Sequence, residues 1–198
     1  MNHIAHCVLS GNNPDLLIGN LLADWLKPAQ KKVLNPKYNL GLALHFCIDD
    51  FTDAHEEVKK ANDLIRPYVG KYAPVVTDVF FDFLLIENWK LYFVQFGVSE
   101  NFTTFFETVY NIIERDLINI PEIFMPRLVS MVNSQWLSSY TTQQGLEIVF
   151  KMLKKRTHFE NNLDRIVPTL FELKPQLNVH FQIFFPELIN AVDKKINC

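Results

Sequence analysis

Apolar residues recur at every third or fourth position along nearly the whole chain, and no segment sustains the alternation of apolar and polar residues that marks a strand. This spacing places apolar side chains on one face of a helix, where they can be buried. It predicts an all-α fold whose helices cover approximately these ranges: 14–27, 36–51, 53–66, 72–95, 99–119, 121–140, 141–155, 159–173 and 176–196.

Local signals refine the predicted helix ends. Asn13 followed by Pro14 is typical of a helix start, because Asn caps free amide groups and Pro has no amide hydrogen to leave unpaired. Asp53, with Glu56 three residues later, resembles a capping box that would open the next helix. Pro175 is expected to separate the last two helices.

The segment 72–95 is apolar on nearly every face, as in a helix at the centre of a bundle. The chain has no internal repeat, low-complexity segment or linker. Its length suits one domain, and 48% hydrophobic residues with 17 Phe exclude a disordered chain. We therefore expect residues 1–198 to form a single-domain helical bundle.

The cysteines and the apolar runs bear on where the protein works. Cys7, Cys47 and Cys198 are odd in number and lack CxxC spacing, which argues against a disulfide framework and favours a reducing compartment. The longest apolar run, at 79–86, is far shorter than the ~20 residues of a membrane span. No signal peptide is recognised at the N-terminus. We expect a soluble, cytoplasmic protein.

The net charge of −3 hides an uneven distribution. Lys and Arg are absent from residues 1–26, 38–58 and 72–89, which hold 10 of the 22 acidic residues. A carboxylate in apolar surroundings needs a partner, and where no base is near, a metal cation is the natural candidate.

Two pairs with four-residue spacing strengthen this hypothesis. His45 and Asp49 would lie on one face of a helix and could point at one cation, and Asp78 and Asp82 could do the same from a neighbouring helix. Mixed His and carboxylate ligands suit Mn, Fe, Zn or Mg. Such a site would activate a water molecule and neutralise charge on a phosphoryl oxygen.

Structural explanations compete with this interpretation. His6, a lone His in an apolar segment, is more often a hydrogen-bonded core group than a ligand, and Asp53 is more often a helix cap. Four other histidines have no evident convergent partner and are expected to be ordinary: His3, His55, His158 and His180.

Basic residues gather at two predicted helix ends. The clusters are Lys27, Lys31 and Lys32, and then Lys154, Lys155 and Arg156. They form either a solvated face or a docking patch for an acidic partner. The negative net charge and the lack of a nucleic-acid motif disfavour binding to nucleic acid.

Five segments, in order and over nearly the whole chain, resemble motifs of one protein family. They are M-N-H-I-A-H at 1–6, I-G-N-L-L-A-D at 18–24, L-H-F-C-I-D-D-F-T-D-A-H at 44–55, Y with D-V-F-F-D and N-W within 72–89, and W-L-S-S-Y, K-R and F-F-P-E-L within 136–188. The family is that of the acyl carrier protein phosphodiesterases.

This resemblance implies an all-helical fold related to the HD-type metal-dependent phosphohydrolases. It implies hydrolysis of the phosphodiester that joins 4′-phosphopantetheine to a Ser of holo acyl carrier protein, with Mn²⁺ or Mg²⁺ as cofactor. It also implies an acidic protein substrate, acyl carrier protein, which suits the basic clusters. The implied metal ligands are His6, Asp24, His45, Asp49 and Asp82. Asp78 or Asp53 would orient a ligand or the attacking water.

The chain departs from the family pattern at two positions. Phe46 stands where the family has an Arg that could grip a phosphate, and Phe83 stands where it has a His after the second Asp. Both changes are expected to place an apolar side chain at the site. Two alternatives therefore stay open: a catalytically impaired homologue that acts as a binding protein, and a phosphohydrolase of another small phosphoester.

Overall fold

The structure of the protein is a computed structural model that describes residues 1–27, 30 and 33–196. All regular structure in these residues is helical, which confirms the predicted all-α fold. The α-helices are α1 (His3–Leu9), α2 (Pro14–Ala23), α3 (Asn39–Ala54), α4 (Glu56–Val69), α5 (Ala73–Glu87), α6 (Trp89–Tyr92), α7 (Phe102–Asp116), α8 (Met125–Asn133), α9 (Gln143–Lys155) and α10 (Val167–Ile196). Short 3-10 helices lie between them: η2 (Pro36–Tyr38), η3 (Gly70–Tyr72), η4 (Leu117–Asn119), η5 (Glu122–Phe124), η6 (Trp136–Tyr140) and η7 (Leu163–Arg165).

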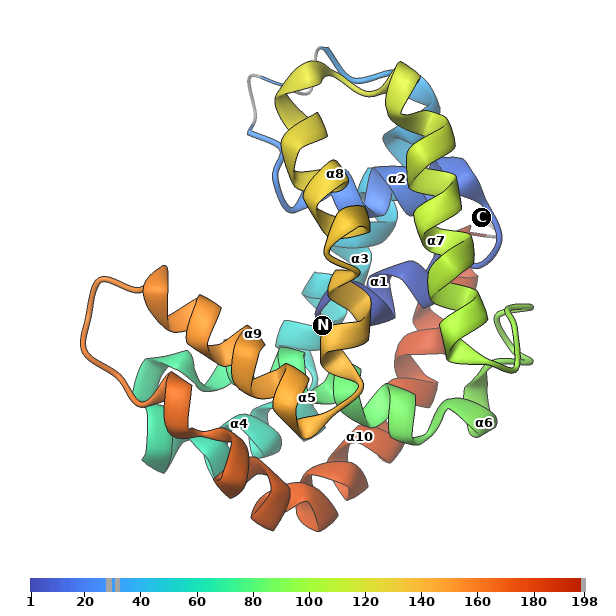
Figure 1. The fold of residues 1–198 in the computed structure, drawn as a ribbon. Helices are drawn as coiled ribbons and strands as arrows, with labels where there is room; N and C mark the ends of the chain where they lie inside the picture. The colour runs from blue at the N-terminus through green and yellow to red at the C-terminus, as the bar shows by residue number, and fades with distance from the viewer. Residues whose placement is uncertain (28–29, 31–32, 197–198) are drawn as a thin grey trace.

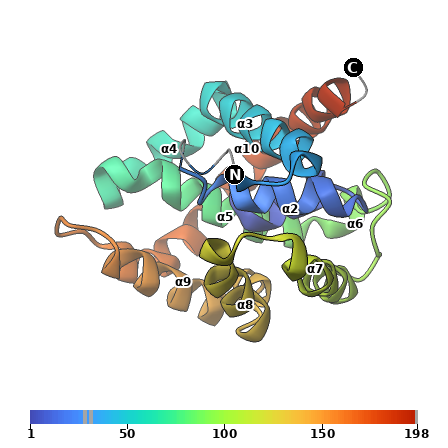
Figure 2. The same ribbon diagram turned by 90° about the horizontal axis from the view of Figure 1, so that it is seen from above.

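The helices pack in layers around α2 and α5. Figure 2 shows α3 and α4 on one side of this pair and α7, α8 and α9 on the other. The long helix α10 packs against α3, α4 and α5 and curves around the lower part of the molecule in Figure 1. The short helix α1 contacts both α2 and α5, so the N-terminal segment lies in the interior of the fold.

Helix α5 is the central helix expected from the apolar segment 72–95, but it ends at Glu87. Its side chains from Val76 to Ile86 are buried, apart from that of Asp78. The side-chain amide of Asn88 donates to the carbonyl oxygen of Leu84, and a separate short helix follows. The Asn88 side chain thus competes with the backbone for a helix carbonyl, and α5 ends there although the apolar pattern continues.

The capping box predicted at Asp53 and Glu56 is wrong. Helix α3 continues through Ala54, and His55 caps α4 by accepting a hydrogen bond from the amide of Glu57 at Nδ1. Thr52 is buried and its hydroxyl donates to the carbonyl of Ile48, so the buried face of α3 extends to its last turn. Asp53 is therefore a helix residue rather than a cap.

The last two predicted helices are one. Helix α10 runs for 30 residues with Pro175 and Pro186 inside it, and it begins at Val167 rather than near residue 159. Proline removes one helix hydrogen bond and favours a bend. Helix α10 continues through the prolines because Leu170 before Pro175, and Leu177, Phe181 and Phe184 between the two prolines, are fully buried.

No helix within the described part of the chain is long and apolar enough to cross a membrane. Cys7 and Cys47 are free thiols, and Cys198 lies outside the described residues.

Candidate metal centre

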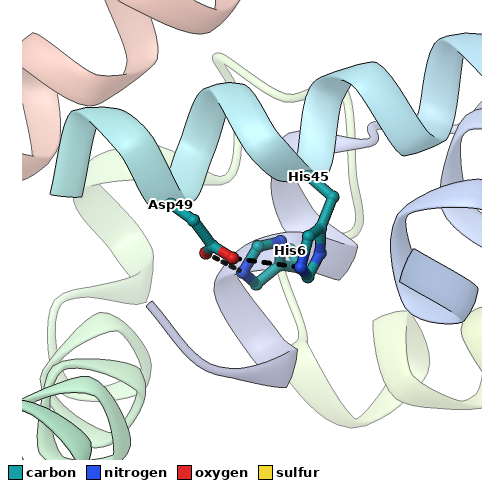
Figure 3. A group of neighbouring side chains, drawn as sticks. All are labelled: His6, His45 and Asp49. Carbon is teal, nitrogen blue, oxygen red and sulfur yellow. Dashed lines mark ion pairs between the residues drawn. The ribbon is translucent and has the colours of Figure 1, made fainter. Parts of the chain in front are cut away.

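Three side chains from two helices meet between α1 and α3. His6 comes from α1, while His45 and Asp49 lie one turn apart on α3, and their ligand atoms lie within 4.8 Å of one another (Figure 3). Nε2 of His6 lies 3.2 Å from Oδ1 of Asp49, and Nε2 of His45 lies 3.0 Å from Oδ2. Both imidazoles are buried, whereas the carboxylate is 39% exposed. The cluster therefore has a buried nitrogen side and an oxygen side open to solvent.

Asn20 of α2 fixes the orientation of both imidazoles. Its Oδ1 lies 2.7 Å from Nδ1 of His6 and 3.2 Å from Nδ1 of His45. Its Nδ2 donates to the backbone carbonyl of His6 and to Oγ of Ser10, each at 3.0 Å, so the amide oxygen must face the two rings. An amide oxygen only accepts, which assigns a hydrogen to Nδ1 of each His.

The donor set fits a divalent cation. Because the Nδ1 hydrogens are committed to Asn20, a cation that replaced the hydrogen at each Nε2 would be bound by these two nitrogens on the side of the rings that faces Asp49. The two rings stack with centroids 4.4 Å apart, so they present these nitrogens side by side. Burial opposes the charge of Asp49, but its hydrogen bonds with His45 and His6 outweigh this and hold its pKa well below the usual range. Two imidazole nitrogens and an ionised carboxylate are ligands of Mn, Fe, Zn or Mg.

Sequence reasoning did not single out Asn20 as a site residue. Its partners are 14 and 25 residues away, so no local spacing reveals them. The available signal was an amide side chain inside an otherwise apolar segment, between Gly19 and Leu21. A buried amide without a partner is costly, so a polar residue at such a position predicts a specific hydrogen-bonding task.

Asp24 lies at the edge of the cluster. It follows the last turn of α2, and its Oδ1 lies 3.5 Å from Nε2 of His45. Its Oδ2 lies 3.7 Å from Nδ1 of His3, so the expectation that His3 has no convergent partner is wrong. Burial lowers the pKa of His3 to about 4. The carboxylate of Asp24, which is 43% exposed, therefore lies between His45 of the cluster and the neutral imidazole of His3.

The two carboxylates of α5 face the start of α1 instead of joining the cluster. Oδ2 and Oδ1 of the fully buried Asp82 accept hydrogen bonds from the backbone amides of Ile4 (2.7 Å) and Ala5 (3.1 Å). Burial raises the pKa of Asp82 to about 7 although these amides favour its charged form. Asp78 forms an ion pair with the terminal ammonium of Met1 at 3.1 Å. Both residues hold the segment that carries His6.

Asp53 lies one turn beyond Asp49, in the last turn of α3, and is exposed. Burial raises the pKa of Asp78, and the negative charges of Asp49 and Asp53 add to this effect. The charge of Asp53 therefore acts on Asp78, the carboxylate that pairs with the terminal ammonium next to α1.

Phe46 and Phe83 stand at positions where the family pattern has a polar residue, and only Phe46 lies at the site. Phe46 is 45% exposed and its ring stands edge-on to that of His45, with centroids 5.7 Å apart. Phe83 is instead buried on α5, where it packs against Phe80 and against Phe171 of α10. The expectation that Phe83 replaces a polar group at the site is wrong, because consecutive residues point to different sides of a helix.

The residues of the two basic clusters differ in their exposure and in their ion pairs. Lys27 is exposed just after α2, and Lys31 and Lys32 lie outside the described residues. Lys154 forms an ion pair with Asp164 at 2.8 Å, and Lys155 and Arg156 are exposed at the end of α9.

Two further histidines have carboxylate partners, contrary to expectation. His55 Nε2 lies 3.1 Å from Glu187 of α10, and His180 Nδ1 of α10 lies 2.6 Å from Glu57 of α4. These contacts tie α10 to the helices on which it packs, so they serve the fold and not the cluster.

Comparison with known proteins gives a consistent result. The model of the family described as acyl carrier protein phosphodiesterase matches residues 1–188. The chain is 26% identical to the acyl carrier protein phosphodiesterase of Escherichia coli O45:K1 (strain S88 / ExPEC), and this match covers 98% of the chain and 99% of that protein. It is 27% identical, with the same coverage, to the proteins of that name from Escherichia coli O6:H1 (strain CFT073) and Escherichia coli strain K12 / DH10B. No solved structure matches the chain. Because the family match spans nearly the full length, the chain belongs to the acyl carrier protein phosphodiesterase family.

Proposed function

We propose that the protein is a metal-dependent phosphodiesterase that removes 4′-phosphopantetheine from holo acyl carrier protein and leaves the apo protein. The observation that carries this proposal is the pair of imidazoles that Asn20 orients toward Asp49. Family membership supports the substrate, since the relatives bear this name.

His6, His45 and Asp49 would hold the ion, and Asp24 at the edge is the further ligand candidate. Mn²⁺ or Mg²⁺ is the proposed cofactor, because oxygen ligands and imidazole suit Mn²⁺ and a site with open positions suits either. When bound, such an ion lowers the pKa of a coordinated water and neutralises charge on the phosphoryl oxygens. Asp82 takes the role of a positioning residue in this proposal, because its oxygens are committed to α1.

The reaction is a hydrolysis. The oxygen of water bonds to phosphorus, the bond from phosphorus to the Ser oxygen of the carrier protein breaks, and that oxygen takes up a proton. Asp53, exposed one turn from Asp49, is the candidate to accept the proton of the attacking water. Asp78 supports the site by holding the chain terminus beside α1.

The exposed bases at the end of α9 are proposed to dock the carrier protein. Acyl carrier protein is strongly acidic, and complementary charge speeds and orients such an encounter. Lys155 and Arg156 are exposed there, whereas Lys154 forms an ion pair with Asp164. Lys27, Lys31 and Lys32 are proposed to extend this patch.

A direct test is incubation of the purified protein with holo acyl carrier protein and Mn²⁺, followed by mass spectrometry of the carrier protein. We expect conversion to the apo mass. Asp49→Asn should abolish conversion and reduce the metal content, whereas Asp50→Asn, the same change at the exposed neighbouring position, should preserve both. A metal-loaded protein that yields no apo product at high enzyme concentration, or an active Asp49→Asn variant, would contradict the proposal.

Phe46 favours a second candidate, a binding protein without turnover. An apolar ring lies beside His45 where the family pattern has Arg, and Phe cannot grip a phosphate. On this alternative the protein binds holo acyl carrier protein and leaves it intact. Conversion of holo acyl carrier protein, or turnover of any substrate in a phosphoester panel, would exclude it.

A further inference from the structure

A pocket beside the candidate metal centre has no part in the function described so far. It lies between α1, η6 and α9 and has a volume of about 110 Å³. Its wall is mainly apolar, and its principal lining residues are Trp136, Ile148, Met152, Tyr140, His3 and Arg156. A cavity needs only about 10–15 Å³ measured in this way to hold one water molecule, so the pocket has room for a small organic group. It suits a small branched group.

Two side-chain contacts link the wall of the pocket to the metal centre. His3 forms part of its wall, and Nδ1 of His3 lies 3.7 Å from Oδ2 of Asp24. The other oxygen of Asp24 lies 3.5 Å from Nε2 of His45. A ligand with its phosphate near the cluster could therefore place its next atoms in this pocket.

Arg156 supplies a positive charge at the pocket. Its side chain is exposed, and within the described residues no hydrogen bond or ion pair is found for it. A guanidinium can donate two parallel hydrogen bonds to a phosphate, which the ring of Phe46 cannot do. The pocket thus combines a free phosphate-binding group with an apolar wall.

These features match one end of the proposed substrate. In 4′-phosphopantetheine the phosphate is attached to a methylene group, and the next carbon carries two methyl groups. We propose that this pocket binds that branched pantoyl end, with the apolar wall of η6 and α9 around the methyl groups and Arg156 on the phosphate. The inference rests on the proposed function for the identity of the ligand. It makes Arg156 a substrate-binding residue and the pocket a determinant of specificity.

Binding can be measured without turnover. Free 4′-phosphopantetheine is titrated into the protein while the indole NMR signal of Trp136 is followed, assigned by its loss in Trp136→Phe. We expect saturable binding that perturbs Trp136 and leaves Trp89, which is buried elsewhere, unchanged. Propyl phosphate, which lacks the branched carbon, should bind about tenfold or more weakly, as when a pocket loses a few methyl groups. Equal affinity for propyl phosphate or for AMP would overturn the proposal.

Variants test the two halves of the pocket. Arg156→Gln should raise the Kd of 4′-phosphopantetheine about tenfold or more, because it removes charge-assisted hydrogen bonds. Arg165→Gln, the same change at an exposed Arg outside the lining, should leave it within about twofold. Met152→Glu should abolish binding and Met152→Leu should restore it, with circular dichroism to confirm folding. Unchanged binding in Arg156→Gln and Met152→Glu would refute the assignment.

The outcomes separate this inference from the function on which it rests. Binding of 4′-phosphopantetheine with the expected variant effects, but no conversion of holo acyl carrier protein, would support the pocket and reject the phosphodiesterase. Conversion of holo acyl carrier protein at a rate that neither Arg156→Gln nor Met152→Glu reduces would support the enzyme and reject the pocket.

Discussion

Gly19 of α2 and Gly41 of α3 meet where their helices cross. A Cβ atom at Gly19 would lie 2.9 Å from Cα of Gly41, and a Cβ at Gly41 would lie 2.8 Å from Cα of Gly19. The backbones can approach this closely only because neither residue has a side chain. The close approach places Asn20, the next residue of α2, within hydrogen-bond distance of His45, which lies one turn after Gly41. The glycine contact therefore sets the geometry of the candidate metal centre.

Gly41→Ala should destabilise the fold and weaken the site together. The new methyl group would meet backbone atoms of α2, including the amide nitrogen of Asn20 at 2.9 Å, and backbone cannot move aside as a flexible side chain can. Overpacking of this kind costs about 1–3 kcal/mol. Urea unfolding and metal titration should both report the loss.

Leu40→Ala is the matched control, because Leu40 precedes Gly41 on α3 and is 48% exposed. It should change the free energy of unfolding by less than about 0.5 kcal/mol. A Gly41→Ala variant as stable as this control would show that the crossing tolerates a side chain.

Asn20→Leu should weaken metal binding while the three ligand side chains stay in place. Asn20 Oδ1 is the acceptor that orients both imidazoles, and loss of such an outer partner costs about 10–100-fold in metal affinity. Isothermal titration with Mn²⁺ would measure it. Ser10→Ala removes a partner of the Asn20 amide nitrogen and a hydroxyl that donates to the His6 carbonyl, but it leaves Asn20 Oδ1 on both rings, so its affinity should lie close to that of the wild type. Identical affinities for Asn20→Leu and wild type would remove Asn20 from the site.

Asp82→Asn distinguishes a metal ligand from a positioning residue. Both oxygens of Asp82 accept amide hydrogens from the first turn of α1, so the amide group of Asn would leave one backbone N–H without an acceptor. A buried donor without a partner costs about 1–3 kcal/mol. We expect a lower melting temperature at unchanged metal stoichiometry. A variant of normal stability that binds less metal would instead identify Asp82 as a ligand.

A contact at the site could be predicted from spacing alone only where the two residues lie close together in the sequence. His45 and Asp49 could be paired from spacing alone, because one helical turn fixes their proximity wherever the helix lies. His6 depended on family resemblance, since its contact with Asp49 crosses between helices. Spacing also places Asp78 and Asp82 on one helical face, but spacing alone could not show that this face meets the start of α1.

The helix ends show the same limit. Pro175 is a strong local signal for a helix boundary, yet α10 continues through it because packing of the residues around it outweighs one lost hydrogen bond. His55 caps α4 in place of Asp53 because the buried face of α3 runs one turn further than the capping pattern indicated. Local sequence signals indicate where a helix could end, and burial against the rest of the fold determines where it does end.

A buried carboxylate distant from the cluster provides a pH-dependent test of the fold. Asp116, at the end of α7, lies 2.9 Å from Nζ of Lys37 and accepts hydrogen bonds from Asn119 and from the hydroxyl of Tyr38. Burial opposes its charge, but the hydrogen bonds from Tyr38, Lys37 and Asn119 outweigh this and hold its pKa below the ordinary value. The contacts join α7 to η2, which leads into α3 and its ligands.

Asp116→Asn should therefore destabilise the protein at neutral pH and much less in acid. Because the pKa of the folded state is the lower one, the charged form stabilises the fold above the unfolded pKa of about 3.9, and this contribution disappears as the pH falls through the folded pKa. We expect a loss of about 1–3 kcal/mol at pH 7, as for hydrogen bonds to a charged group. Urea unfolding of variant and wild type between neutral pH and about pH 3 would show the difference shrink. Asp164→Asn, which breaks the more exposed pair with Lys154, should change stability little at any pH. An equal loss from Asp116→Asn at both ends of the range would mean that the charge of Asp116 does not contribute to the fold.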